Sequence, residues 1–200
     1  MFYALFFHFA FLPFHSYHIT MLEKGLVQVY TGSGKGKTTA ALGLAVRAAG
    51  WRKKVIIYQF LKPSALTLGE RKAIRKIKLP IKIEPIDIKW DIAKSFNDKN
   101  TVENARKKIS RICSKIADEA KQKKYDIIIL DEIVFCLSKK LADIAWIKNI
   151  IESRGSSVEV VLTGRGATSK LMALADLVTE MKEIKHPFKK NIKARKGIEF

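Results

Sequence analysis

A glycine-rich stretch between two apolar runs constrains the fold of this chain more than any other feature. Residues 30–39 read Tyr-Thr-Gly-Ser-Gly-Lys-Gly-Lys-Thr-Thr, after the apolar run 25–30 and before the small apolar run 38–49. A strand, a glycine loop with Lys-Thr and a helix in this order are typical of a phosphate-binding loop. Glycines let backbone N–H groups approach a polyphosphate, and the helix N-terminus adds the positive end of its dipole. We therefore predict a nucleotide site whose loop comprises Gly32, Ser33, Gly34, Lys35, Gly36, Lys37, Thr38 and Thr39.

Two side chains at the end of this loop can bind a nucleotide and its metal ion. Lys37 can contact the outer phosphates of a nucleotide, and the hydroxyl of Thr38 can bind Mg²⁺. The glycine spacing is unusual, because Thr31 stands five residues before Gly36, where such loops commonly have a glycine. The run 38–49 is small and apolar on most sides, which predicts a buried helix.

Two carboxylates follow another apolar run further along the chain. Residues 126–132 read Asp-Ile-Ile-Ile-Leu-Asp-Glu, which predicts a buried strand that ends at Asp131 and Glu132. Ligands of open α/β sheets bind at the carboxyl ends of the strands. We expect one carboxylate to hold Mg²⁺ or its waters and the other to bind the metal or act as a base. A strand end followed by a helix-capping Asp is the structural alternative.

From residue 25 on, strand-like runs alternate with helical patterns. This alternation predicts a P-loop NTPase fold of the RecA-like type, an α/β fold with a mostly parallel sheet flanked by helices. Asn100 is expected to start a long helix, with Glu103 at the spacing of a capping box. Arg165 follows a strand end, where it could contact phosphate or lie on the surface in a turn. The other expected segments are strands at 55–60, 81–88, 158–162 and 176–181, helices at 141–153 and 167–174, and a loop at 61–71.

The composition limits the class of protein and its compartment. The chain has 200 residues, 48% of them hydrophobic, which suits one globular domain, and we expect that domain to span 21–200. The net charge of +19 fits either a polyanionic partner or a solvated basic surface. We expect no nucleic acid partner, because no stretch interleaves aromatic and basic residues. Cys113 and Cys136 form no Cys-x-x-Cys pattern, which argues against a cysteine metal site and fits a reducing cytoplasm.

The first twenty residues differ from the rest, since they contain no Lys, Arg, Asp or Glu. Their apolar run, 2–14, is too short to span a bilayer and lacks the basic start of a signal peptide, so we expect no membrane partner. We expect residues 1–20 to be a disordered extension or a wrongly assigned start before Met21. A segment that touches a membrane or covers the active site is the alternative.

Several longer motifs are similar to those of a known family. They resemble, in the same order along residues 25–200, the P-loop type of ATP:corrinoid (cob(I)alamin) adenosyltransferase. The alternating glycines are typical of that family, and Lys-His-Pro-Phe with a Gly-Ile-Glu-Phe end is more specific than the loop. The matching segments are 29–41, 58–62, 69–70, 129–133, 161–165, 175–180, 185–188 and 194–200.

The resemblance implies a transfer reaction in adenosylcobalamin synthesis or salvage. Co(I) of a reduced corrinoid would attack C5′ of ATP, and inorganic triphosphate would leave whole. By position in the motifs, Lys37 and Arg165 would be catalytic residues that stabilise charge on the triphosphate. Thr38, Asp131 and Glu132 would hold Mg²⁺ or Mn²⁺, and Trp90 would lie on the corrinoid side.

The resemblance also implies partners, namely a flavoprotein or another reductase and a second copy of the chain in a cytoplasmic homodimer. The sequence departs from the family at four places. Ser33 stands where Asn is frequent, Ile88 where a Phe would lie beside the corrin, and Asn191 where Gly is usual. The stretch 61–70 is one residue longer than expected and lacks a tryptophan. The ATP half of the match is therefore stronger than the corrinoid half.

Two other classes of enzyme share this loop and sheet. A RecA-like ATPase stimulated by nucleic acid would hydrolyse ATP to ADP and phosphate, with Glu132 as the base. A nucleoside kinase would release ADP and a phosphorylated acceptor. The phosphate product separates these alternatives from the transferase, which releases triphosphate.

Overall fold

The computed structural model describes residues 24–88, 90 and 95–200. The expectations for residues 1–20 and for a start at Met21 lie outside the described residues. The strands are β1 (Val27–Thr31), β2 (Val55–Gln59), β3 (Ile81–Pro85), β4 (Ile127–Asp131), β5 (Glu159–Thr163) and β6 (Leu177–Glu180). The helices are α1 (Lys37–Gly50), α2 (Gly69–Ile77), α3 (Lys99–Lys121), α4 (Ile133–Ser138), α5 (Ile144–Ser153) and α6 (Ser169–Met172), with short 3₁₀ turns η1 (Ser95–Asn97) and η2 (Pro187–Lys190).

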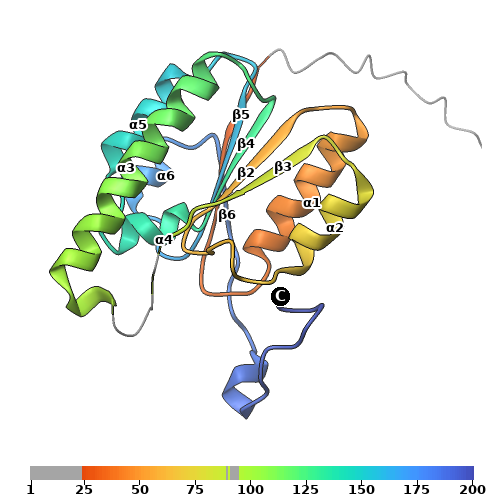
Figure 1. The fold of residues 1–200 in the computed structure, drawn as a ribbon, viewed down its shortest axis with the longest axis vertical. Helices are drawn as coiled ribbons and strands as arrows, with labels where there is room; N and C mark the ends of the chain where they lie inside the picture. Colours follow the sequence, from red (N-terminus) through yellow and green to blue (C-terminus); the bar gives the residue numbers. More distant parts are fainter. Residues whose placement is uncertain (1–23, 89, 91–94) are drawn as a thin grey trace, which may run out of the picture.

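The strands form one sheet in the order β3-β2-β4-β5-β1-β6, and every described pairing is parallel. The predicted parallel α/β sheet is thus confirmed. Helices α1 and α2 cover one face, and α3, α4, α5 and α6 lie on the other (Figure 1). Because the strands are parallel, the segments that follow β1, β2, β4 and β5 all emerge at the same edge of the sheet.

The core lies on both faces of the sheet, which explains the uninterrupted apolar strands. All five residues of β2, β4 and β5 are buried. Along β4, Ile128 and Leu130 pack into the core under α3 and α5, whereas Ile127 and Ile129 pack with the alanines of α1. Strands covered by helices on both sides are apolar on both faces along their middle, and the buried polar residues of these three strands, Gln59, Asp131, Glu159 and Thr163, stand at strand ends.

The first helix is less buried than its composition predicts. Ala41 and Ala45 are at most 2% exposed, but Val46 on the opposite face is 51% exposed. The prediction of a helix buried on most sides was therefore wrong, since α1 packs against the sheet along one stripe only. Small side chains on that stripe let the helix that follows the phosphate-binding loop lie close to the strands.

Two helices were missed where the sequence predicted other structure. Helix α2 begins at Gly69, within the segment 61–71 that was expected to be a loop, and runs on to Ile77; none of its nine residues is buried. The helix is short and mostly charged, and among its few apolar residues Ile74 packs against the core only in part, so it was not recognised from the sequence. The expected helix 141–153 begins only at Ile144, and the short helix α4 directly follows β4.

The long helix α3 starts one residue earlier than predicted. Its N-cap is Asp98, whose carboxylate accepts hydrogen bonds from the backbone N–H groups of Asn100 and Thr101. Glu103 pairs with Lys107 and does not close a capping box. Within the described part of the chain, no helix is long and apolar enough to span a bilayer.

Candidate functional site

The glycine loop between β1 and α1 has a backbone that only glycine adopts easily. Gly32 has φ +97° and Gly36 has φ +119°, both in the left-handed region. The N–H of Gly34 donates to the carbonyl of Met181, across 2.6 Å. A Cβ on Gly32 would lie 2.5 Å from that same carbonyl oxygen. The backbone after β6 therefore packs directly against the glycine loop. Glycines at 32 and 34 allow this close approach, because a Cβ there would collide with Met181.

Lys37 is held inside this loop. Its ammonium donates to the carbonyl oxygens of Gly32 at 2.8 Å and Gly34 at 2.6 Å, and its side chain is buried. Burial lowers the pKa of Lys37, the positive charge of Arg165 lowers it further, and Glu132 acts in the opposite direction. The loop thus holds a cation close to the place where its backbone N–H groups can donate hydrogen bonds to phosphate oxygens.

Asp131 joins three elements at the carboxyl edge of the sheet. It is 1% exposed, and its Oδ1 accepts hydrogen bonds from the hydroxyls of Thr38 at 2.9 Å and Thr163 at 2.8 Å. Its Oδ2 forms an ion pair with Lys62 at 2.7 Å. A buried carboxylate needs such compensation, because water no longer solvates its charge.

Lys62 reaches this carboxylate from the loop after β2. Its ammonium lies 3.3 Å from the Thr38 hydroxyl, in addition to the ion pair with Asp131. The guanidinium of Arg71 donates to the carbonyls of Lys62, Pro63 and Leu66, while its Nε donates to the side chain of Gln59. Arg71 therefore fixes the loop that carries Lys62.

Glu132 and Arg165 complete the polar residues around the cavity. Glu132 has φ +68° as the N-cap residue of α4, and its N–H donates to the Thr163 hydroxyl at 3.1 Å. Burial and the charge of Asp131 raise the pKa of Glu132, and the charges of Lys62, Lys37 and Arg165 oppose this. Arg165 is exposed, as expected for a cation at the mouth of a cavity.

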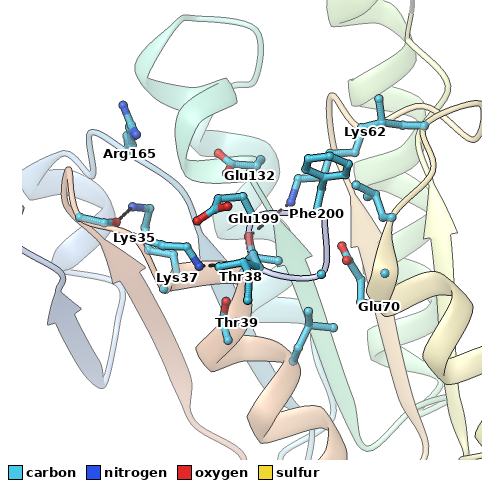
Figure 2. Close-up of a pocket in the computed structure, with 18 of the residues that line it drawn as sticks. Lys35, Lys37, Thr38, Thr39, Lys62, Glu70, Glu132, Arg165, Glu199 and Phe200 are labelled. Atoms are coloured by element: carbon cyan, nitrogen blue, oxygen red, sulfur yellow. Dashed lines mark hydrogen bonds between the residues drawn. The ribbon is translucent and has the colours of Figure 1, made fainter. Parts of the chain in front are cut away.

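These groups line a cavity of about 590 Å³. Figure 2 shows Lys37, Thr38 and Thr39 along its floor, Glu132 and Arg165 on one side, and Lys62, Glu70 and Phe200 on the other. The volume falls in the range that takes a nucleotide-sized ligand. Lys35, Lys37 and Arg165, together with the N-terminus of α1, make the loop side of the cavity suitable for a polyphosphate.

The predicted site residues do not all lie in this cavity. Gly34, Lys35, Gly36, Lys37, Thr38, Thr39, Glu132 and Arg165 line it. Asp131 lies behind Thr38, and Gly32 contributes a carbonyl to Lys37. The hydroxyl of Ser33 accepts from the N–H of Glu183 at 3.3 Å, outside the lining. The side chain of Lys35 donates to the carbonyl of Ile198.

Trp90 is placed away from the nucleotide cavity. Its ring packs edge-on against Phe96, with 4.8 Å between the centroids, beside the core under α3. Its indole N–H is buried and has no partner among the described residues. Ile88 is 5% exposed and belongs to the same core. The expected role of Trp90 toward a corrinoid stays a prediction.

Sequence reasoning did not single out several contributors to the site, and Glu70 and His186 in the cavity lining are two of them. Lys62, Thr163 and the last residues of the chain, Gly197 to Phe200, all lie at the cavity or its buried carboxylate. Lys62 and Thr163 reach Asp131 because β2 and β5 flank β4, a neighbour relation that strand order alone determines. Motif segments 58–62, 161–165 and 194–200 were the only sequence signals for them.

Comparison with known proteins agrees with this geometry. Residues 23–200 match the family model described as ATP:corrinoid adenosyltransferase BtuR/CobO/CobP. The corrinoid adenosyltransferase of Escherichia coli K12 is 31% identical over 178 residues, covering 89% of this chain and 87% of that protein. The corrinoid adenosyltransferase of a Sinorhizobium species is 36% identical over 182 residues, covering 89% and 81%.

A solved structure supports the fold. The flagellar accessory protein FlaH of Methanocaldococcus jannaschii superimposes with a TM-score of 0.51 at 12% identity, covering 78% of this chain and 71% of that chain. At this identity the likeness concerns the fold alone, and it agrees with the RecA-like α/β arrangement predicted from the loop and the strand pattern.

Proposed function

The chain belongs to the ATP:corrinoid adenosyltransferase family, and we propose that its ATP binds in the cavity between the phosphate-binding loop and the C-terminal residues. The family reaction is the ATP-dependent adenosylation of a corrinoid. One observation supports this location above others. Lys37, Thr38 and Asp131 converge at the carboxyl edge of the sheet, where open α/β sheets bind their ligands.

In this transfer, Co(I) of the reduced corrinoid donates an electron pair to C5′ of ATP. A Co–C bond forms, the C5′–O bond breaks, and triphosphate leaves with the electrons of that bond. Co(I) is already a strong nucleophile, so the protein needs no base to activate it. Its contribution is to position the substrates and to stabilise the charge of the leaving group.

We assign that stabilisation to residues of the loop and its surroundings. Lys37 lies within the loop, next to the space for phosphate, and Arg165 lies at the cavity. Both are cations that can form charge-assisted hydrogen bonds with phosphate oxygens. Backbone N–H groups of the loop and the N-terminus of α1 add further donors.

We propose that Thr38, Asp131 and Glu132 hold Mg²⁺ or Mn²⁺. A hydroxyl and two carboxylates supply the oxygen ligands that these hard cations prefer. No cluster of three or more His, Cys, Asp and Glu suited to a metal occurs in residues 24–88, 90 and 95–200. This fits a cation that takes the rest of its ligands from phosphate and water, and such a cation would neutralise charge on the triphosphate.

The remaining partners are also proposals. A flavoprotein or another reductase supplies the Co(I) state, since the transfer consumes a reduced corrinoid. A homodimer is supported by Leu177 and Val178 on the edge strand β6, each 41% exposed. The free, buried thiols of Cys113 and Cys136 suit a reducing cytoplasm. The match from residue 23 onward supports one domain over 21–200.

The test is to incubate the full chain with Mg²⁺, ATP and chemically reduced cobalamin, without oxygen and in dim light. The expected products are a light-sensitive alkylcobalamin, seen in its absorption spectrum, and intact triphosphate, seen by phosphorus NMR. ADP and phosphate with an unchanged corrinoid would contradict the transferase and favour the ATPase reading.

A further inference from the structure

The nucleotide cavity has two chemically different ends. The loop end carries Lys37 and the first turn of α1, as described above. The lining also includes the apolar residues Leu42, Leu66, Leu68 and Phe200, and Phe200 lies on the side away from Arg165, together with Lys62 and Glu70. A ligand with one polyanionic end and one flat, uncharged end fits this division, with its flat end on the apolar surface.

The last residues of the chain are held in place at that second end. Lys35 donates to the carbonyl of Ile198 at 3.0 Å, which ties the C-terminal segment to the phosphate-binding loop. A Cβ on Gly69 would lie 3.7 Å from the carbonyl atoms of Phe200, so the start of α2 contacts the end of the chain. The segment therefore bridges the two rims of the cavity.

Local bonds also fix the shape of this segment. Arg195 forms an ion pair with Glu199 at 3.1 Å, and the N–H of Gly197 donates to the carbonyl of Phe200 at 2.7 Å. Gly197 has φ +81°, which a residue with a Cβ rarely adopts. Arg195 also offsets the negative charge of Glu199 next to a site for phosphate.

Although the C-terminal segment is held in place, Phe200 is still largely exposed to solvent. Phe200 is 42% exposed, and of the two leucines that line the same cavity Leu66 is 47% exposed and Leu68 is 7% exposed. Figure 2 shows Phe200 near Lys62, on the side of the cavity away from Arg165. An exposed aromatic ring and an exposed aliphatic side chain lining one cavity are the kind of surface on which a purine base stacks.

We propose that Phe200, with Leu66 and Leu68, forms the wall that binds the adenine base of ATP. The inference rests on the proposed location of ATP, because the triphosphate at the loop end directs the nucleoside toward this wall. Phe200 is then a specificity residue of the transfer reaction, and it acts by holding the adenosyl group while C5′ reacts.

The test compares two ligands that share the triphosphate and differ in the base. The affinities of ATP and of inorganic triphosphate, each with Mg²⁺, are measured by calorimetry for the full wild-type chain and for Phe200→Leu. This variant keeps the length of the chain and its terminal carboxylate but lacks the ring. We expect ATP to bind roughly tenfold more weakly and triphosphate to bind within twofold of the wild type.

Two further variants sharpen this comparison. Phe200→Tyr keeps an aromatic ring and is expected to bind ATP as the wild type does. Ile192→Ala changes an exposed apolar residue of the same tail that does not line the cavity, and it is expected to change neither affinity. Thermal unfolding of each variant verifies that the fold is intact.

The outcomes separate the base wall from the proposed function. If Phe200→Leu bound ATP and triphosphate equally more weakly, the C-terminal segment would have only a structural role, and the proposal would be overturned. Unchanged or tighter ATP binding would do the same, the latter because the tail would then compete with the nucleotide. A wild-type chain that binds neither ligand would overturn the proposed function, and the base wall with it.

Discussion

The hydroxyl of Thr38 donates a hydrogen bond of 2.9 Å to Asp131, which links the first turn of α1 to the end of β4. The two residues are 93 positions apart in the sequence. Their contact unites the phosphate-binding loop with the acidic strand end, because β1 and β4 are parallel and both pair with β5. The metal site that we propose depends on this contact.

Replacing Thr38 tests that metal site directly. Thr38→Ala removes the hydroxyl, so we expect the Mg²⁺ concentration for half-maximal activity to rise about tenfold. Thr38→Ser restores the hydroxyl and should return it near the wild-type value. The matched control is Thr179→Ala, since Thr179 is exposed on the edge strand β6 and does not line the cavity. An equal change in Thr38→Ala and Thr179→Ala would contradict the assignment.

Lys37→Ala is expected to reduce kcat/KM by a factor of about 100 or more, because the leaving triphosphate loses a charge-assisted contact. The rate of alkylcobalamin formation at several ATP concentrations provides the measurement. Lys72→Ala removes a cation from the exposed face of α2 and should leave the rate unchanged. Activity near the wild-type level in Lys37→Ala would refute the role of this lysine.

Sequence reasoning located most of the site but not its connections. The glycine loop, Asp131 and Glu132 were identifiable because local patterns place them at strand ends. Lys62 could not be assigned, because its contact with Asp131 depends on β2 lying beside β4. The pairing of Asp98 with the start of α3 was missed in favour of Asn100, since both are good capping residues and only backbone geometry chooses between them.

The fold shows the same limit. Strands that are buried on both faces were found from their apolar runs, whereas α2 was missed because it is short and mostly charged and none of its side chains is fully buried. The degree of burial of α1 was overestimated, because alanines favour a helix without indicating how much of it is covered. Trp90 was assigned by resemblance alone, and its ring contact with Phe96 could not be predicted from the sequence.

Lys62 and Asp131 form an ion pair, so we expect the effects of mutating them on stability to be coupled. Lys62→Met leaves the buried carboxylate with two hydroxyl donors, so we expect the free energy of unfolding to fall by about 1–3 kcal/mol. The double variant Lys62→Met with Asp131→Asn should recover part of this loss, as urea denaturation will measure. The control Lys148→Met removes an exposed helix pair and is expected to cost under about 0.5 kcal/mol. Additive losses in the double variant would contradict the coupling.

The lowered pKa of Glu84 leads us to expect that the stability of the fold depends on pH. Its burial raises its pKa, but hydrogen bonds from Lys115 and Lys82 outweigh burial, and the pKa lies below its usual 4.5. A carboxyl group with a lowered folded-state pKa stabilises the fold above its unfolded pKa, and this contribution is lost as pH falls through the folded pKa. We therefore expect the stability difference between wild type and Glu84→Gln to be largest near neutral pH and to shrink below pH 4.5.

Denaturation of both proteins at several pH values measures this difference. Glu152→Gln serves as the control, because Glu152 pairs with Lys148 on an exposed helix surface. A gap between wild type and Glu84→Gln that stays constant down to acid pH would show that Glu84 acts through packing and not through its charge.

Arg71 is predicted to act on ATP binding through Lys62 and not by touching the nucleotide. Its guanidinium bridges three carbonyls of the 62–66 loop, and a lysine ammonium in its place cannot span them. In Arg71→Lys we expect the loop to lose its order and the KM for ATP to rise about fivefold, with a smaller change in kcat. Arg75→Lys, at an exposed position of the same helix, should alter neither constant. If Arg71→Lys lowered kcat and left KM unchanged, the loop would not be positioning a residue for ATP binding, and Arg71 would have a different role.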